Sequence, residues 1–131
     1  MLNLFNFFEK HLKISVFILL VISFIIFYVS SLSFYSLDNK ELDIESVLYH
    51  FSVFFLFGLF LMICLVRGRN KELFSLAAIL SLGYAVLDEF HQIFVPNRSA
   101  SIGDVLVDMF GVVFAFLIYS ISLNYRRIKK F

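Results

Sequence analysis

The segment from Asp88 to Asp108 holds the side chains of this sequence that are best suited to chemistry. Four carboxylates, one histidine and one arginine fall within these 21 residues, in a chain otherwise dominated by Phe, Leu, Ile and Val. Ionisable groups beside long apolar runs are costly and are usually retained for a function. On a helix, residues three or four apart share a face, so Asp88 pairs with His91 and Asp104 pairs with Asp108.

These two pairs make a divalent cation one candidate ligand. Carboxylate oxygens suit Mg²⁺ or Mn²⁺, whose usual substrates carry phosphate. The candidate metal ligands are Asp88, His91, Asp104 and Asp108. No established spacing of metal ligands, such as His-Glu-x-x-His, is present, so this interpretation depends on residue types alone.

The composition places these residues in a membrane protein. Hydrophobic residues make up 61% of the chain and aromatic residues 19%, and the mean hydropathy is +0.93. A soluble domain of this length cannot bury so much apolar surface. A net charge of +1 without a basic patch argues against nucleic acid as a partner, and the single cysteine rules out an internal disulfide. The sequence predicts one membrane domain over residues 1–131.

Four apolar runs are long enough to cross a bilayer as helices. The first covers residues 14–37 without a charge, which is about 36 Å of helix against a hydrocarbon core of about 30 Å. The other predicted spans are residues 46–66, 73–95 and 104–123. The expected fold class is therefore all-α, an integral membrane four-helix bundle.

The distribution of Lys and Arg predicts the orientation of this bundle. One side receives nine of the eleven: Lys10, Lys13, Arg67, Arg69, Lys71, Arg126, Arg127, Lys129 and Lys130. The other side receives Lys40 and Arg98. Because cytoplasmic loops carry the excess of Lys and Arg, both termini are expected to be cytoplasmic. His50 and the polar residues between Asp88 and Asp108 then gather at the extracytoplasmic end.

Helical spacing predicts which polar residues share a face. One stripe on the third span contains Ser81, Tyr84, Asp88 and His91. Glu89 lies about 100° from that stripe, so it faces a different neighbour or the membrane interface. A stripe on the fourth span contains Asp104, Asp108, Gly111 and Ala115, and its small residues allow another helix to come close. Pro96 ends the third helix or starts the turn after it.

Binding, transport and structural roles also fit these residues. Arg98, the hydroxyls of Ser99 and Ser101 and the following helix N-terminus would suit a phosphate or carboxylate head group. Proton-coupled transport is less favoured, because four short spans lack broken helices and internal symmetry. In a structural role, Arg98 pairs with two carboxylates and pins the third span to the fourth. Ser101 and Asp104 then cap a helix, and His50 makes a satisfied polar contact.

One long motif in this segment matches a known pattern. Its residues are Asp88, Glu89, His91, Gln92, Phe94, Pro96, Arg98, Ser99, Ser101, Asp104, Asp108 and Gly111. The motif resembles the signature of the VanZ-like family of bacterial membrane proteins, and His50-Phe51 gives a weaker match in the second span. The family often has Gly at the position of Asn97, and Asn also tolerates a left-handed turn. Many members have an Asp-Lys pair shortly before the His, where this chain has Ser46 and Val47.

The resemblance implies a multi-pass protein of the bacterial cytoplasmic membrane, in a family named for lower susceptibility to teicoplanin. We expect binding rather than catalysis, with an envelope lipid, a cell-wall precursor or an amphiphilic glycopeptide as ligand. The sequence is also compatible with an oligomer. Arg98 would bind the anionic group, Asp88 and Asp108 would orient it, and His91 and His50 would line the pocket. The alternative is a metal-dependent enzyme acting on a lipid-linked phosphate at the outer membrane face. The expected ligand-binding residues are His50, Asp88, Glu89, His91, Gln92, Arg98, Ser99, Ser101, Asp104 and Asp108, with Pro96 and Gly111 in structural roles.

Overall fold

The computed structural model describes residues 2–33, 44–68, 70, 72–98 and 100–128, and these residues form five helices. The helices are α1 (Leu2–Lys10), α2 (Leu12–Ser30), α3 (Ile44–Val66), α4 (Leu73–Gln92) and α5 (Ile102–Ile128). No strand occurs among the described residues, so the predicted all-α fold class is confirmed. Helices α2 to α5 are each long and apolar enough to cross a membrane, which confirms the four predicted spans.

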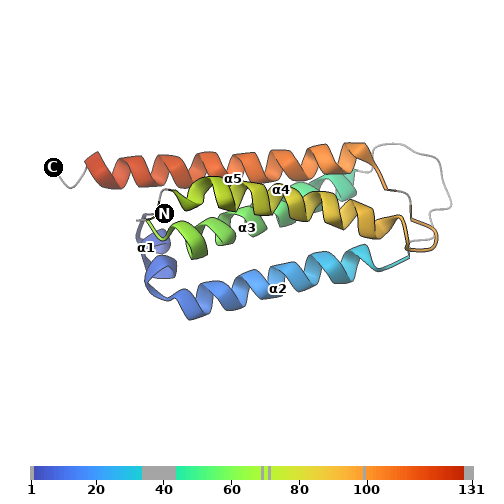
Figure 1. The fold of residues 1–131 in the computed structure, drawn as a ribbon, viewed down its shortest axis with the longest axis horizontal. Helices are drawn as coiled ribbons and strands as arrows, with labels where there is room; N and C mark the ends of the chain where they lie inside the picture. The colour runs from blue at the N-terminus through green and yellow to red at the C-terminus, as the bar shows by residue number, and fades with distance from the viewer. Residues whose placement is uncertain (1, 34–43, 69, 71, 99, 129–131) are drawn as a thin grey trace.

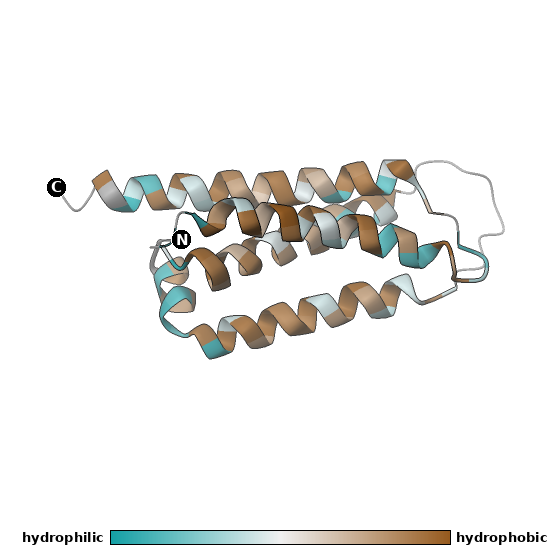
Figure 2. Cartoon of the chain, in the orientation of Figure 1, coloured by the Kyte–Doolittle hydropathy of each residue, from teal (hydrophilic) through white to brown (hydrophobic). Residues whose placement is uncertain are grey.

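The four long helices form an elongated bundle in which α3 and α4 lie between α2 and α5 (Figure 1). The two central helices contact each other, and each contacts both flanking helices. Hydrophobic residues follow the length of the helices, and hydrophilic residues collect toward their ends (Figure 2). Large apolar side chains such as Phe17, Ile79, Phe110 and Ile121 are exposed on the outside. This is the surface that a membrane-spanning bundle presents to lipid.

The helix ends differ from the predicted span boundaries at α2, α4 and α5. Helix α2 ends at Ser30, because the chain turns at residues 31–33, and the remainder of the predicted span, 34–37, lies outside the described residues. Helix α4 ends at Gln92 rather than 95, because the amides of Phe94 and Val95 bond carbonyls three residues back as the chain turns ahead of Pro96. Helix α5 begins at Ile102 and continues to Ile128 instead of ending at 123.

Helix α1 was not among the predicted elements. It packs against the bundle through aromatic contacts, with the ring centroids of Phe5 and Tyr119 5.8 Å apart and those of Phe8 and Phe60 5.2 Å apart. Glu9 on α1 forms a salt bridge with Arg126, whose Nη1 lies 2.7 Å from Glu9 Oε2. The first and last described helices are therefore joined at one end of the bundle.

Close packing between α3 and α5 brings their backbones together. A Cβ atom on Gly111 would lie 2.5 Å from the carbonyl oxygen of Phe51 and 3.0 Å from the amide nitrogen of Phe55. The first distance is shorter than real Cβ contacts and the second is tighter than most of them, so only glycine fits without a shift of the backbone. The expected close helix approach at Gly111 is confirmed, and it holds the first turns of α5 against α3.

Candidate functional site

Six buried polar side chains lie at one end of the bundle, opposite α1 and the C-terminal end of α5 (Figure 1). We call this set the polar layer. It comprises Ser30 from the last turn of α2, His50 from the second turn of α3, Asp88, Glu89 and Gln92 from the end of α4, and Asp108 from the second turn of α5. Alternating helix directions bring these turns together from positions far apart in the sequence.

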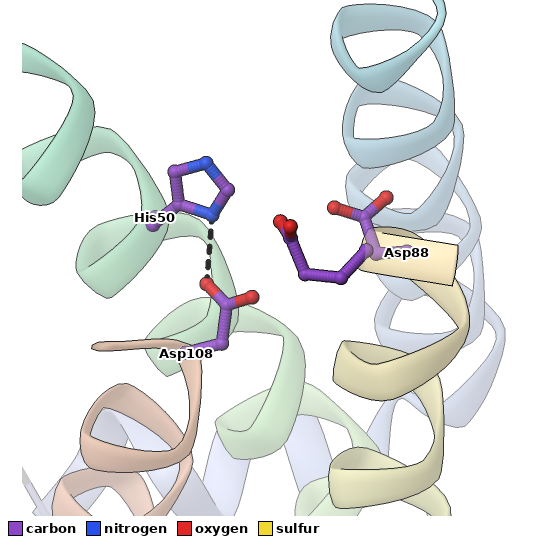
Figure 3. A group of neighbouring side chains, drawn as sticks. His50, Asp88 and Asp108 are labelled. Atoms are coloured by element: carbon purple, nitrogen blue, oxygen red, sulfur yellow. Dashed lines mark hydrogen bonds and ion pairs between the residues drawn. The ribbon is translucent and has the colours of Figure 1, made fainter. Parts of the chain in front are cut away.

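His50 and Asp108 form the contact between α3 and α5 in this layer. Nδ1 of His50 lies 2.9 Å from Oδ1 of Asp108, and the two residues are only 1% and 0% exposed. The other carboxylate oxygen, Oδ2 of Asp108, is buried and has no hydrogen-bond partner among the described residues. Figure 3 shows this oxygen pointing away from His50, toward the space between Asp108 and Asp88.

The carboxylates of α4 are held by hydrogen bonds from three directions. Ser30 Oγ donates to Asp88 Oδ1 at 2.5 Å, which ties α2 to α4. Gln92 Nε2 donates both to Asp88 Oδ2 at 3.0 Å and to Glu89 Oε1 at 2.8 Å. The amide of Gln92 therefore links two neighbouring carboxylates and fixes their orientation.

Glu89 also reaches the start of α5. The backbone N–H of Ser101 donates to Glu89 Oε2 at 2.9 Å, and Ser101 Oγ accepts the N–H of Gly103 at 3.1 Å. Ser101 therefore caps α5, as its position suggested. The acceptor for the Ser101 N–H is supplied by Glu89 from another helix, so Glu89 faces a different neighbour rather than the membrane interface.

Arg98 connects the turn after α4 to the end of α2. Its Nε donates to Gln92 Oε1 at 2.9 Å, and its Nη1 donates to the carbonyl oxygens of Val29 at 3.0 Å and Leu32 at 3.4 Å. Asn97 adopts a positive φ of 60°, the left-handed turn expected at this position. Arg98 thus reaches the carboxylates of Asp88 and Glu89 through the amide of Gln92.

Four of the predicted site residues converge, but they are not the predicted metal set. His50, Asp88, Glu89 and Asp108 each offer one ligand atom, and these atoms lie within 4.8 Å of one another. Asp104 stays half-buried outside this group. His91 is rotated toward α2, where its Nε2 lies 3.0 Å from Ser31 Oγ and its ring packs beside Phe27. Ser99 lies outside the described residues.

Ser30 was not among the predicted site residues. A serine pair at the end of an apolar run was the only available signal in the sequence, and the partner of Ser30 is 58 positions away. A second polar cluster, at the opposite end of the bundle, was not predicted either; there, Tyr119 Oη donates to Glu9 Oε1 at 2.7 Å. In that cluster the N–H of Gly68 donates to Tyr119 Oη, and Arg126 bonds both carboxylate oxygens of Glu9.

An apolar groove runs along the seam between α4 and α5. Its volume is about 300 Å³, and it is lined by Phe74, Ala78, Leu82, Val112, Val113, Phe116, Leu117 and Ser120. Ala78, Leu82 and Glu89 follow helical spacings of four and seven residues, so they lie on one face of α4. The end of the groove at Leu82 and Val112 is therefore the end nearer the polar layer.

The polar layer concentrates negative charge in a poorly solvated place. Three carboxylates and one imidazole are buried together, and ionised carboxylates buried without compensation are strongly unfavourable. Protons, a cationic group or a metal ion can supply that compensation. The arrangement can therefore hold a cation, or orient a polar head group at the membrane edge.

Comparison with known proteins gave one match. The profile of a protein family described as VanZ/LLP1 matches residues 2–123, nearly the whole chain. No curated protein and no solved structure matches the chain.

Proposed function

The chain belongs to the VanZ/LLP1 family and is a multi-pass membrane protein, and from this premise and the site geometry we propose that it binds the head group of an envelope amphiphile. The binding face is the extracytoplasmic face of the cell membrane. The candidate ligands share a polar head and an apolar tail: an envelope lipid, a lipid-linked cell-wall precursor, or a glycopeptide such as teicoplanin. Retention of the glycopeptide at this site lowers susceptibility to it.

The observation that carries this proposal is that the apolar groove and the polar layer lie along the same two helices, α4 and α5. Glu89 lies seven residues, or about 10 Å of helix, beyond Leu82 on the same face of α4. An amphiphile with its chain beside Leu82 and Ala78 would have its head group at the end of the groove nearer the polar layer. Such pairing of an apolar cavity with a few fixed polar groups is typical of small-molecule sites.

The surroundings of the polar layer favour a ligand that arrives from the bilayer. Phe90, Ile93, Phe94 and Ile102 flank this end of α4 and α5, and all four are exposed. Apolar side chains exposed at a membrane boundary lie among lipid chains. A ligand with an apolar tail can approach along this surface without leaving the membrane.

The charge distribution supports the outer location of the site. Among the described residues, Lys10, Lys13, Arg67 and Arg126 belong to the end of the bundle that carries α1 and the C-terminal part of α5, and Arg98 belongs to the other end. By the excess of Lys and Arg on cytoplasmic loops, the polar layer lies at the extracytoplasmic side.

In this proposal each polar residue contacts a different part of the ligand or of the pocket. Arg98 contacts the anionic part of the head group, with its guanidinium pre-oriented by Gln92 and the carbonyl oxygen of Val29. Asp88 and Asp108 orient the head group or receive an ammonium group. His50 lines the inner wall of the pocket, whereas His91, on the α2 side, stays outside it.

Native mass spectrometry of the purified protein tests this proposal. The protein in detergent is incubated separately with a polyisoprenyl phosphate, phosphatidylethanolamine and teicoplanin. We expect a one-to-one complex with at least one of them. The variant Ala78→Phe fills the groove and should weaken binding by about tenfold, the effect of roughly 1.4 kcal/mol. The matched control Ile79→Phe, at an exposed neighbouring position, should bind like the parent protein.

Two outcomes would contradict the proposal. One is a protein that binds none of the three probes, and the other is an Ala78→Phe variant that binds as tightly as the Ile79→Phe control. The same spectra test catalysis, because conversion of the polyisoprenyl phosphate to its alcohol would favour the metal-dependent enzyme over a binding protein.

A further inference from the structure

The polar layer contains a compact set of metal-ligand atoms from three helices. One atom each from His50, Asp88, Glu89 and Asp108 falls in a group whose members are all within 4.8 Å of one another. The four side chains are buried, so their positions are set by helix packing rather than by solvent. Within these four described residues, one pair is joined directly by a hydrogen bond, His50 and Asp108. The close approach of the other members is not accounted for by direct hydrogen bonds between them.

An independent observation points to a ligand inside the group. Asp108 is 0% exposed, and its Oδ2 atom accepts no hydrogen bond from the described residues. Buried acceptors are nearly always satisfied, so an exception requires an explanation. Figure 3 shows this oxygen on the side of Asp108 that faces the helix of Asp88. A cation at that point would be its partner.

The spacing of the four atoms fits one ion after a small adjustment. Ligands of a tetrahedral ion with bonds of about 2.1 Å lie about 3.4 Å apart. The ligand atoms here lie up to 4.8 Å apart, so the most distant of them need to approach by at most about 1.4 Å. Imidazole nitrogen favours Zn²⁺ and other transition metals, and carboxylate oxygen favours Mn²⁺ and Mg²⁺. The mixed set of one nitrogen and three oxygens therefore favours Zn²⁺ or Mn²⁺ over Mg²⁺ or Ca²⁺.

Hydrogen bonds around the group hold the carboxylates in the way that metal ligands are held. Ser30 Oγ and Gln92 Nε2 donate to the two oxygens of Asp88, and the N–H of Ser101 donates to Glu89. Donors of this kind orient ligating carboxylates and are an integral part of metal sites. None of these donors carries a charge, so they orient the carboxylates without neutralising them.

We propose that His50, Asp88, Glu89 and Asp108 form a binding site for one divalent transition-metal ion, Zn²⁺ or Mn²⁺. The ion joins α3, α4 and α5 at one end of the bundle and neutralises much of the charge of the carboxylates. This site differs from the sequence-based metal set, since Glu89 and His50 replace His91 and Asp104. It goes beyond the proposed amphiphile binding, because an ion can bind here without any lipid.

Metal binding is measured on the full chain in detergent, without added lipid. After treatment with a chelator and its removal, Zn²⁺ or Mn²⁺ is titrated by calorimetry, and the bound metal is counted by elemental analysis. We expect one ion per chain. The variant Asp108→Asn should weaken binding at least about tenfold, as loss of a ligand costs no less than loss of an outer-shell partner. The control Asp104→Asn, one turn away outside the group, should bind as the parent does.

Two further measurements guard against a variant that fails to fold. Glu89→Gln removes a second carboxylate ligand and should also lower the affinity for the ion. In a parent chain carrying His11→Gln and His91→Gln, pulsed electron paramagnetic resonance of bound Mn²⁺ should detect nitrogen from His50. Substoichiometric metal in the parent protein, equal affinity in the Asp108→Asn and Asp104→Asn variants, or the absence of nitrogen coupling would each overturn the site. Failure to bind an amphiphile would leave these results unaffected.

Discussion

Gly111 shows how a residue without a side chain controls the candidate site. It lies three positions after Asp108, and its α-carbon faces the backbone of Phe51 across the contact between α3 and α5. The two backbones meet there. His50, next to Phe51, and Asp108, about one turn before Gly111, therefore come close enough for their Nδ1 and Oδ1 atoms to lie 2.9 Å apart. The close approach of the helices and the polar contact are therefore parts of one arrangement.

Replacement of this glycine tests that link. Gly111→Ala places a Cβ 2.5 Å from the carbonyl oxygen of Phe51, so the helices must separate. We expect a loss of roughly 1–3 kcal/mol in the free energy of unfolding, as for other overpacked sites. Thermal unfolding in detergent measures it as a lower Tm.

The matched control is Gly83→Ala on α4. A Cβ at Gly83 would meet no atom within 4 Å, so this variant should be as stable as the parent or slightly more stable. An equal Tm for the two alanine variants would show that the α3–α5 contact is not tight at Gly111.

The identity of the site residues followed from the sequence better than their directions did. Asp88, Glu89 and Asp108 were recognised because charges beside apolar runs are conspicuous. Their partners were not, because the rotation of each helix about its axis depends on packing with its neighbours. Asp88 faces Ser30 on α2, and a turn of about 100° sends Glu89 toward α5. His91, three residues after Asp88, also faces the end of α2, so it shares the stripe of Asp88 but does not join the carboxylates.

Helix α1 is the element that packing, rather than hydropathy, explains. It is too short to span a membrane, and Asn3, Asn6 and Glu9 interrupt its apolar residues. Its position depends on Phe5 beside Tyr119 and on the salt bridge from Glu9 to Arg126, more than 100 positions away. A pattern search along the chain cannot find such a pairing, whereas the four apolar runs are visible because hydropathy is a local property.

Loss of the charge on Glu9 should release α1. Glu9→Gln leaves the largely buried guanidinium of Arg126 without its carboxylate and weakens the hydrogen bond from Tyr119. We expect a loss of roughly 1.5–3 kcal/mol, typical of hydrogen bonds to charged groups. Limited proteolysis should then cut near His11, between α1 and α2, faster than in the parent. Lys10→Gln, at the exposed neighbouring residue, is the control and should be cut at the parent rate.

The complete bundle has two polar ends of different character. At one end, Glu9, Tyr119 and Arg126 form a charge-balanced cluster, and at the other the polar layer is rich in carboxylates. Between them, the aromatic rings of Phe54, Phe57 and Tyr84 pack in an apolar middle. The number of spans and the gathering of His50, Asp88 and Asp108 at one end were predicted from the sequence and confirmed. The orientation in the membrane stays a prediction.

Cysteine labelling in intact cells tests that orientation. In a Cys64→Ser background, Ala100→Cys and Asn70→Cys place single thiols at exposed positions at opposite ends of the bundle. A membrane-impermeant maleimide should label Ala100→Cys in intact bacteria, and Asn70→Cys only after the membrane is permeabilised. The reverse labelling pattern would place the polar layer at the cytoplasmic side of the membrane and would exclude ligands of the outer leaflet.

The contact between His50 and Asp108 also has a consequence for biosynthesis. These residues are 58 positions apart, and Asp108 belongs to α5, which leaves the ribosome after α3 and α4. Until α5 inserts, His50 lacks its carboxylate and Glu89 lacks the Ser101 amide, so both face lipid or one another. Because polar groups in hydrocarbon are costly, a nascent chain that stops after α4 should be less stable in the membrane than the complete bundle. Insertion of α5 supplies the partners of both His50 and Glu89.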